Sequence, residues 1–228
     1  MSTSKVNNKN LFMKVHDLGL IDYRSGLSFQ EKLHKVVKNE NKDQIILLEH
    51  EKVITIGTKG SNKDILFSQN ELEKQGFTIW KTDRGGQATI HNEGQCVVYM
   101  LIRLKKYNLK PVDFVRKVEK LIGKLLEDFS IDSEVIEGKT GVWVKSGKIF
   151  KKIAAIGVRV SEGITLHGFA LNVNNELNDF NTIVPCGLPQ SKVTSMKNEL
   201  YKEINKDSLK ERLMSNIKEI FDCEVNFG

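Results

Sequence analysis

Two β-rich runs separated by a short turn constrain the fold of this chain more than any other stretch. The runs cover residues 151–160 and 164–173, and Ser161-Glu162-Gly163 lies between them. Consecutive runs rich in Val, Ile and other β-formers, joined by a short turn that contains Gly, predict a β-hairpin. A Pro185-Cys186-Gly187 loop follows the second run. The fold must therefore contain a sheet that accommodates this hairpin.

Further segments predict strands around the hairpin. Residues 95–104, Q-C-V-V-Y-M-L-I-R-L, form a nearly continuous apolar run, which is typical of a strand buried on both faces. Residues 11–23 predict an edge strand, and residues 44–58 predict two strands broken at Glu51-Lys52. Residues 77–82 predict another strand. The region 132–173 is predicted to be β throughout, with turns at Gly138 and Ser146-Gly147.

Helices are interspersed among these strands. Pro111 opens the clearest one, because apolar residues recur at i, i+3, i+4 and i+7 as far as Phe129. Capping-box patterns predict three other helix starts, at Ser28, Ser68 and Ser208. Strands and helices do not alternate strictly, so the pattern favours an α+β fold, a mixed β-sheet with packed helices, over a doubly wound parallel sheet.

Length and composition predict one soluble domain over residues 1–228. The chain has 228 residues and 39% hydrophobic content, which suits a single packed core. No apolar run reaches the length of a membrane span, and residues 1–10 contain no apolar signal core. We therefore expect a cytoplasmic protein, or one of an organelle (mitochondrion or plastid) if a transit segment has been removed, without membrane contact.

The charge and the cysteines exclude several functional classes. A net charge of +6 favours acidic partners, but the basic residues are interleaved with Asp and Glu, as on a solvated surface. Aromatic residues make up 7% and do not alternate with Arg in a stacking pattern, so no nucleic-acid partner is expected. The three cysteines, Cys96, Cys186 and Cys223, contain no C-x-x-C spacing, which argues against a disulfide framework and a metal site. No cofactor is expected.

Cys186 and Lys152 are the candidate catalytic pair. A lone cysteine is often a small core hydrophobe, as we expect for Cys96, but Pro185 and Gly187 leave Cys186 in an accessible loop. Lys152 enters a run of small apolar residues, where it is either a solvated charge at a strand edge or a partly buried amine. An amine close to a thiol favours the nucleophilic thiolate. The hypothesis is that the two meet in space and perform acyl transfer.

Two further segments carry candidate binding residues. Arg84-Gly85-Gly86-Gln87 and His91 combine a forked cation with glycines that permit close backbone approach, although a simple turn explains the glycines equally well. His167 lies in an otherwise apolar strand, where a satisfied core histidine is the usual explanation. Gly168 beside it has no side chain and could leave room for an apolar ligand chain.

Together these motifs resemble the lipoyl(octanoyl) transferase family. In order they are E-H-x-x-V-x-T-x-G at 49–57, R-G-G-Q-x-T-x-H at 84–91, G-Q at 94–95, G-V-W-V at 141–144, K-I-A-A-I-G-V-R-V at 152–160, T-L-H-G-F-A-L-N-V at 165–173 and P-C-G at 185–187, followed by Thr194-Ser195. The resemblance covers roughly residues 20–200. Where the family usually has H-G-P-G-Q, this chain has His91-Asn92-Glu93-Gly94-Gln95, which alters one turn at the rim of the pocket.

The resemblance implies the fold of the biotin and lipoate protein ligase catalytic domains and a transfer of octanoyl from octanoyl-acyl carrier protein to a lysine of a lipoyl domain. The acceptors would be lipoyl domains of 2-oxoacid dehydrogenases or the glycine cleavage H protein. Cys186 would carry the acyl thioester, and Lys152 would favour its thiolate and handle protons. The implied acyl-binding residues are Arg84, Gly85, Gly86, Gln87, Ala88, Thr89, Ile90, His91, Ala155, Ile156, Gly157, Gly168, Phe169 and Ala170, with His167 as a possible addition.

Two alternatives stay open from the sequence. An ATP-dependent lipoate or biotin ligase of the same fold would use a lysine in the same context but would not need Cys186. A non-catalytic acyl- or nucleic-acid-binding module would also be consistent with the basic composition, and it would show salt-dependent binding.

Overall fold

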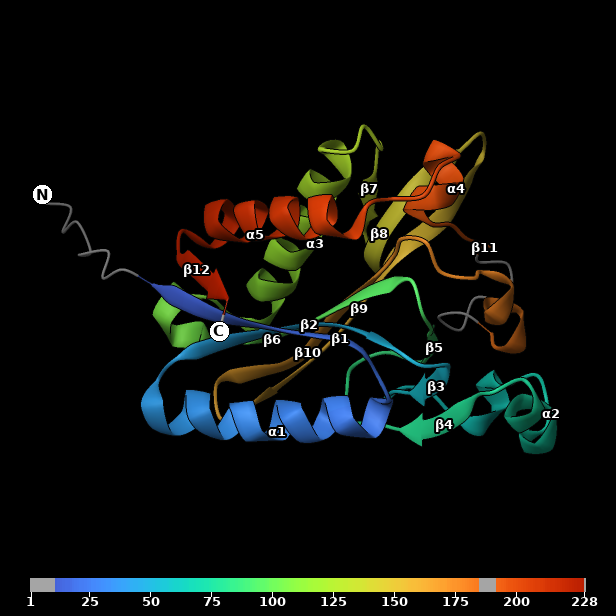
Figure 1. The fold of residues 1–228 in the computed structure, drawn as a ribbon, viewed down its shortest axis with the longest axis horizontal. Helices are drawn as coiled ribbons and strands as arrows, with labels where there is room; N and C mark the ends of the chain where they lie inside the picture. The colour runs from blue at the N-terminus through green and yellow to red at the C-terminus, as the bar shows by residue number, and fades with distance from the viewer. Residues whose placement is uncertain (1–10, 185–191, 228) are drawn as a thin grey trace, which may run out of the picture.

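A mixed nine-stranded sheet forms the centre of the computed structural model, which describes residues 11–184 and 192–227 (Figure 1). Eight strands follow the order β12-β1-β2-β6-β10-β9-β8-β7, and β11 pairs with β9. Their bounds are β1 Phe12–Ile21, β2 Asp43–His50, β6 Gln95–Leu101, β7 Glu134–Ile136, β8 Lys139–Ser146, β9 Ile149–Ser161, β10 Ile164–Asn172, β11 Lys192–Val193 and β12 Glu224–Phe227.

The connections determine which strands are parallel. The chain returns through a helix between β1 and β2, and these two strands are parallel, as are β12 and β1. From β2 through β6, β10, β9 and β8 to β7 all neighbours are antiparallel. The predicted hairpin is confirmed as β9–β10, which turns at Glu162 and Gly163, both at positive φ. The run predicted as a buried strand at 95–104 is confirmed as far as Leu101, where the fully buried strand β6 ends.

A second sheet of three strands, in the order β4-β3-β5, packs beside the first. Its strands are β3 Val53–Ile56, β4 Thr78–Lys81 and β5 Ala88–His91. The predicted break at Glu51-Lys52 is confirmed, and it sends β2 and β3 into different sheets. The sequence did not predict β5, because its four residues directly follow the glycine-rich turn and are too short to show a period.

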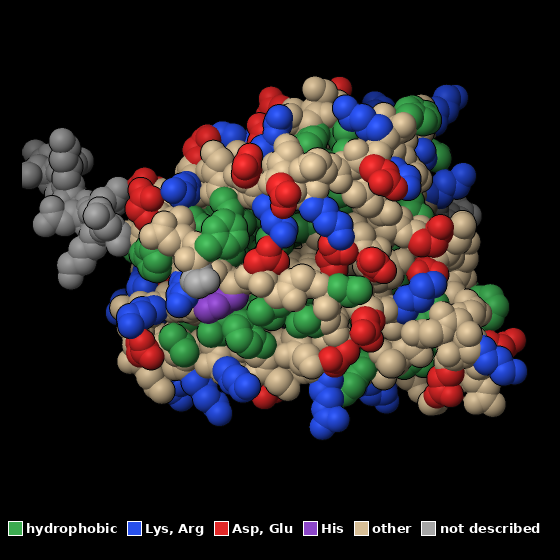
Figure 2. Space-filling model, in the orientation of Figure 1, with side chains coloured by type: hydrophobic (Ala, Val, Ile, Leu, Met, Phe, Trp, Pro, Cys, Tyr) green, Lys and Arg blue, Asp and Glu red, His purple; other side chains and the backbone are tan. Residues whose placement is uncertain are grey.

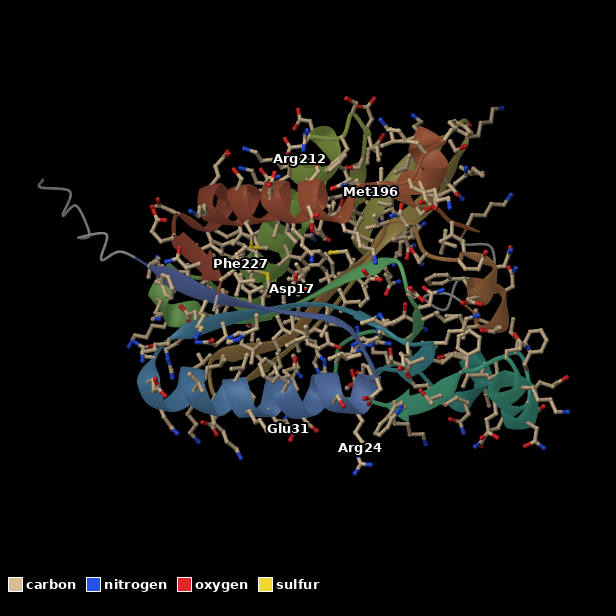
Figure 3. The ribbon with its side chains drawn as sticks, viewed as in Figure 1. Asp17, Arg24, Glu31, Met196, Arg212 and Phe227 are labelled. Atoms are coloured by element: carbon tan, nitrogen blue, oxygen red, sulfur yellow. The ribbon has the colours of Figure 1, made fainter. Side chains whose placement is uncertain are left out.

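Helices cover both faces of the large sheet. α1 (Tyr23–Glu40) lies on one face, while α3 (Pro111–Glu127) and α5 (Lys206–Phe221) lie on the other (Figure 1). The apolar side of α1 packs on the sheet, and its polar residues such as Arg24 and Glu31 point away from it (Figure 3). The remaining short helices are α2 Gln69–Lys74, α4 Met196–Leu200, η1 Asn62–Asp64, η2 Leu104–Tyr107 and η3 Asn178–Thr182.

Two of the three predicted helix starts are wrong. α1 begins at Tyr23, since the Asp22 side chain already accepts from the amide of Ser25 at 3.0 Å, and Ser28 lies inside the helix. α5 begins at Lys206 under an Asn205 cap, not at Ser208. The capping box at Ser68 is confirmed at the start of α2.

The strand predicted at residues 11–23 exists, but it is not at the edge. β12 pairs with its outer side in parallel, with Phe12 opposite Glu224. A four-residue strand at the end of the chain gave no detectable pattern. The α+β class, a mixed sheet with packed helices, is confirmed.

Candidate active site

A cavity of about 440 Å³ lies on the α1 face of the large sheet, against the small sheet. Its walls come from β9 and β10, from the 84–91 segment that leads into β5, from β6, from the β7–β8 turn and from the first residue of α1. It therefore forms where the two sheets meet, and these six separate segments contribute to it.

A bulge in β9 places Lys152 in this cavity. Val142 of β8 faces Ala154, but the next residue, Trp143, faces Lys152, so Ile153 is the extra residue. Ile153 and Ala154 both pack into the core on the α3 side. Lys152 and Ala155 consequently both line the cavity, which a regular strand would not allow for residues three apart.

Polar and aromatic contacts hold the Lys152 side chain. It is 8% exposed, and its Nζ donates to the Thr140 carbonyl oxygen at 3.1 Å. The same nitrogen lies 4.7 Å from the centroid of the Trp143 ring, a cation–π geometry. Gly141, at φ +122°, leaves the space that the lysine uses, because an added Cβ there would lie 3.3 Å from Lys152 Cε.

Cys186 lies outside the described residues, and the chain on its C-terminal side returns to the lysine. β11 runs parallel to β9, with Val193 paired with Lys152. The amide of Thr194 donates to the Lys152 carbonyl oxygen at 2.9 Å. Before the gap, the Val184 amide donates to the Asp64 carbonyl oxygen at 2.8 Å. Cys186 is therefore seven positions in the sequence before Val193, the residue that pairs with Lys152.

Arg84 organises the glycine-rich wall of the cavity. Its guanidinium donates to the Thr55 hydroxyl and carbonyl and to the carbonyls of Gly85 and Gln87, at 2.7–3.1 Å. The side chain is 8% exposed. These contacts fix the 84–87 loop to β3, and the forked cation of Arg84 thus engages neutral groups of its own chain.

His167 is turned into the cavity by an unusual backbone conformation. In a regular β10 it would face away from Leu166 and Gly168, but at φ +59° its ring lies 6.0 Å from that of Tyr99 on the cavity side. Two contacts stabilise this conformation: the His167 amide donates to Gln30 Oε1 at 2.6 Å, and Nε2 donates to Asp83 Oδ1 at 2.7 Å. The buried Nδ1 has no partner among the described residues.

Two further histidines have fixed tautomers: His91, which lines the cavity, and His50, whose ring packs against those of His91 and Tyr99. The Gln95 amide group donates to the Ile90 carbonyl and to Asn172, so its oxygen accepts from His91 Nδ1 at 2.7 Å. His50 Nδ1 donates to a carbonyl oxygen at 3.1 Å, and its Nε2 accepts from Tyr99 at 2.7 Å.

Burial keeps all three histidines neutral near pH 7. Desolvation lowers the pKa of His50 and of His167 to about 4. Desolvation, with smaller contributions from His50 and Arg84, lowers the pKa of His91 to about 3. Burial also raises the pKa of Tyr23 and Tyr99. This part of the cavity is therefore polar in composition but uncharged at its imidazole and phenol groups.

The structure brings nearly all the described candidate residues together. Those that line the cavity are Arg84, Gly85, Gly86, Gln87, Ala88, Thr89, His91, Lys152, Ala155, Ile156, Gly157, His167, Gly168, Phe169 and Ala170. Ile90 does not, because it is fully buried in the core of the small sheet. Gly168 allows close pairing with β6, since an added Cβ would lie 2.1 Å from the Val98 carbonyl oxygen.

The sequence missed several residues of the cavity. They are Tyr23, Val97, Tyr99, Gly138, Lys139, Thr140 and Trp143. Trp143 lies within the G-V-W-V motif and could have been found from it, whereas Val97 and Tyr99 look like core residues in a continuous apolar run. Tyr23 gives no signal, because the pattern of residues 11–23 predicts a strand.

The other two cysteines are buried. Cys96 and Cys223 are 8% and 9% exposed, and burial raises the pKa of each thiol to about 12. Neither is a nucleophile in this environment. In residues 11–184 and 192–227 no group of three or more His, Cys, Asp or Glu side chains could hold a metal ion. No helix in that part of the chain is long and apolar enough to cross a membrane.

Comparison with known proteins gives matches over almost the whole chain. An octanoyltransferase of Flavobacterium psychrophilum is 36% identical over 230 residues, which cover 95% of this chain and 99% of the relative. A lipoate-protein ligase A bound with ATP has a TM-score of 0.78 at 14% identity, covering 94% and 87% of the two chains. A biotin protein ligase from Aquifex aeolicus has a TM-score of 0.57 at 14% identity, covering 92% and 70%.

The two structural matches share the fold of this chain. A family model, the lipoyl protein ligase A/B catalytic domain, matches residues 22–218, a range that contains every candidate site residue. The chain therefore belongs to the lipoyl protein ligase A/B catalytic domain family.

Proposed function

We propose that this protein is an octanoyltransferase that moves an octanoyl group from octanoyl-acyl carrier protein to a lysine of a lipoyl domain, through a thioester on Cys186. The full-length similarity to an octanoyltransferase supports the reaction class. Within the structure, the pairing of Val193 with Lys152 carries the proposal, because it ties the segment that follows Cys186 to the buried lysine.

The shape of the cavity suits an extended acyl chain. On β9 its wall runs from Lys152 to Gly157, which corresponds to about 16 Å of strand. Few side-chain atoms protrude from this wall, because four of its residues have no side chain larger than a methyl group: Ala155, Gly157, Gly168 and Ala170. An octanoyl chain with its carbonyl beside Lys152 fits within that length.

The first half-reaction exchanges one thioester for another. The Cys186 thiolate attacks the octanoyl carbonyl carbon, the bond to the carrier sulfur breaks, and the carrier thiol leaves with the proton that Cys186 gave up. The Lys152 ammonium would stabilise the thiolate by proximity. Because one thioester replaces another, the step is close to thermoneutral and needs no ATP.

The second half-reaction forms an amide. The neutral amine of the acceptor lysine attacks the octanoyl-Cys186 carbonyl, the C–S bond breaks, and a proton passes from the amine to the departing thiolate, with Lys152 as the group that relays it. The acceptors we propose are lipoyl domains of 2-oxoacid dehydrogenases or the glycine cleavage H protein. No cofactor enters either step.

Intact-mass measurement tests this proposal against the ATP-dependent ligase. The protein is mixed with octanoyl-acyl carrier protein without ATP, and then with an apo lipoyl domain. We expect one octanoyl group on the enzyme, its transfer to the domain, and loss of both in Cys186→Ala at an unchanged melting temperature. Near-wild-type turnover by Cys186→Ala, or transfer only with free octanoate and ATP, would contradict the proposal.

A further inference from the structure

The net positive charge of this protein is concentrated in one hairpin. Residues 139–161, which form β8 and β9, contain five lysines and one arginine and no aspartate or glutamate. The whole chain has a net charge of +6, so the remaining residues carry equal numbers of basic and acidic side chains. The interleaved pattern that the sequence suggested therefore does not hold for this hairpin.

Most of these lysines have no carboxylate partner in the described part of the chain. Arg159 pairs with Asp83, and Lys152 lies in the cavity. Lys139, Lys145, Lys148 and Lys151, with Lys192 of the adjacent β11, form no ion pair within residues 11–184 and 192–227. Lys139 lines the cavity at the other end of β8, so we call Lys145, Lys148, Lys151, Lys192 and Ile149 the basic hairpin surface.

The basic hairpin surface also contains an exposed apolar side chain. Ile149 is 43% exposed at the start of β9, directly after Lys148. The nearest carboxylates in sequence, Glu134 and Glu137, belong to β7 and its turn, where Glu134 faces Trp143 and not the tip of the hairpin. Basic side chains are visible along the upper right of the molecule, where the ends of β8 and β9 lie (Figures 1 and 2). In the register of β8 and β9, Ile149 shares a strand face with Lys151, and Lys192 of β11 pairs with Lys151. An exposed apolar residue next to cations without carboxylate partners is suited to an acidic protein partner.

The distance to Lys152 distinguishes the two proposed protein partners, the acyl carrier protein and the lipoyl domain. Lys148 and Lys152 are four residues apart on one hairpin, about 13 Å along the strand. An acyl carrier protein presents its acyl group at the end of a long phosphopantetheine arm, which can span that separation. An acceptor lysine has only a four-carbon stem, so its domain must bind closer to Lys152.

We propose that the basic hairpin surface is the docking site of the acidic acyl carrier protein that donates the acyl group. This inference rests on the proposed function, because the carrier is the donor in that reaction. The positive charges attract the acidic carrier through the solvent, and the carrier binds beside the tip of the hairpin. Lys152 and the cavity then remain accessible to the phosphopantetheine arm that carries the acyl group.

The test reverses two charges that do not line the cavity. In the variant K145E/K148E, KM for octanoyl-acyl carrier protein should rise roughly ten- to a hundredfold at low salt, with kcat unchanged and a weaker salt dependence. Turnover with an octanoyl thioester of a small thiol, which has no carrier surface, should stay at the wild-type level. The matched control K32E/K35E reverses two exposed lysines with the same spacing on α1 and should behave as wild type.

The outcomes separate the two proposals. If the wild-type protein transfers octanoyl from neither donor, the proposed function fails. If it transfers from both and K145E/K148E leaves KM for the carrier unchanged, or weakens both donors equally, the docking site is wrong. A rise in KM for the lipoyl domain instead of the carrier would also overturn the assignment, because the surface would then bind the acceptor.

Discussion

Mild acid should destabilise this protein through three buried histidines. His50, His91 and His167 are neutral in the folded chain, where burial holds each pKa well below its ordinary value of about 6.5. In the unfolded chain the same groups gain a proton as the pH falls through about 6.5. The unfolded state therefore binds more protons between about pH 4 and pH 6.5, and the free energy of unfolding falls as the pH is lowered in this window.

The size of the effect follows from the pKa values. With folded-state pKa values of about 4, 3 and 4, each histidine changes the free energy of unfolding by about 2 kcal/mol between pH 7 and pH 5. Three such groups give about 6 kcal/mol, which is a large part of the roughly 5–15 kcal/mol that stabilises a typical domain. The contributions interact, because His50 and His167 both lower the pKa of His91.

Urea unfolding at pH 7, 6 and 5 measures this loss directly. We expect the midpoint to fall steeply below pH 6 in the wild-type chain, and the variant His91→Gln to lose about 2 kcal/mol less than the wild type over the same interval. A free energy of unfolding that stays constant from pH 7 to pH 5 would refute the reasoning. So would an unchanged pH dependence in His91→Gln, because then the buried imidazole would not be a source of it.

Two further substitutions test the geometry of the site. Lys152→Ala should lower kcat by about a hundredfold or more with an intact fold, because it removes the cation proposed to stabilise the thiolate, and steady-state kinetics with octanoyl-acyl carrier protein would measure it. Gly168→Ala should destabilise the protein by about 3 kcal/mol in urea unfolding, because its Cβ would lie 2.1 Å from the Val98 carbonyl oxygen. Gly147→Ala is the control: with nothing within 4 Å of its Cβ, only its positive φ should cost about 1 kcal/mol. Equal losses in the two glycine variants would contradict the close strand approach at Gly168.

The parts of the fold that the sequence predicted are those governed by local rules. The capping box at Ser68, the turn after Ser161 and the buried run in β6 each depend on neighbours in the sequence. The errors occur where a segment distant in the sequence determines the structure. β1 is internal only because β12, about two hundred residues later, pairs with it, and no local pattern of residues 11–23 contains that information.

The predicted starts of α1 and α5 are wrong for a related reason. Both Asp22 and Ser28 are possible caps for α1, and Asp22 caps it because the turn before Ser28 already buries Tyr23 and Gly26. At α5, Asn205 caps the helix ahead of Ser208. A capping-box pattern identifies a possible start, and tertiary packing decides whether the helix already began upstream.

The candidate site was found from its motifs and not from the periodicity of its strands, and the structure explains why. Alternation with a period of two assumes a regular strand. Both strands of the central hairpin break that rule at the cavity, β9 by the extra residue Ile153 and β10 by the positive φ of His167. These irregularities place Lys152 with Ala155, and His167 with Gly168, on one face where a regular hairpin would separate them.

Each irregularity depends on contacts with other segments. Gln30 of α1 and Asp83 hold His167, while Thr140 and Trp143 of β8 hold the side chain beside the bulge. A regular hairpin would present only one member of each pair to an acyl chain and would bury the other in the core. The functional face of this sheet is thus made by local departures from strand geometry that the rest of the fold stabilises, and a variant that restored the regular register would lose the cavity while keeping the sheet.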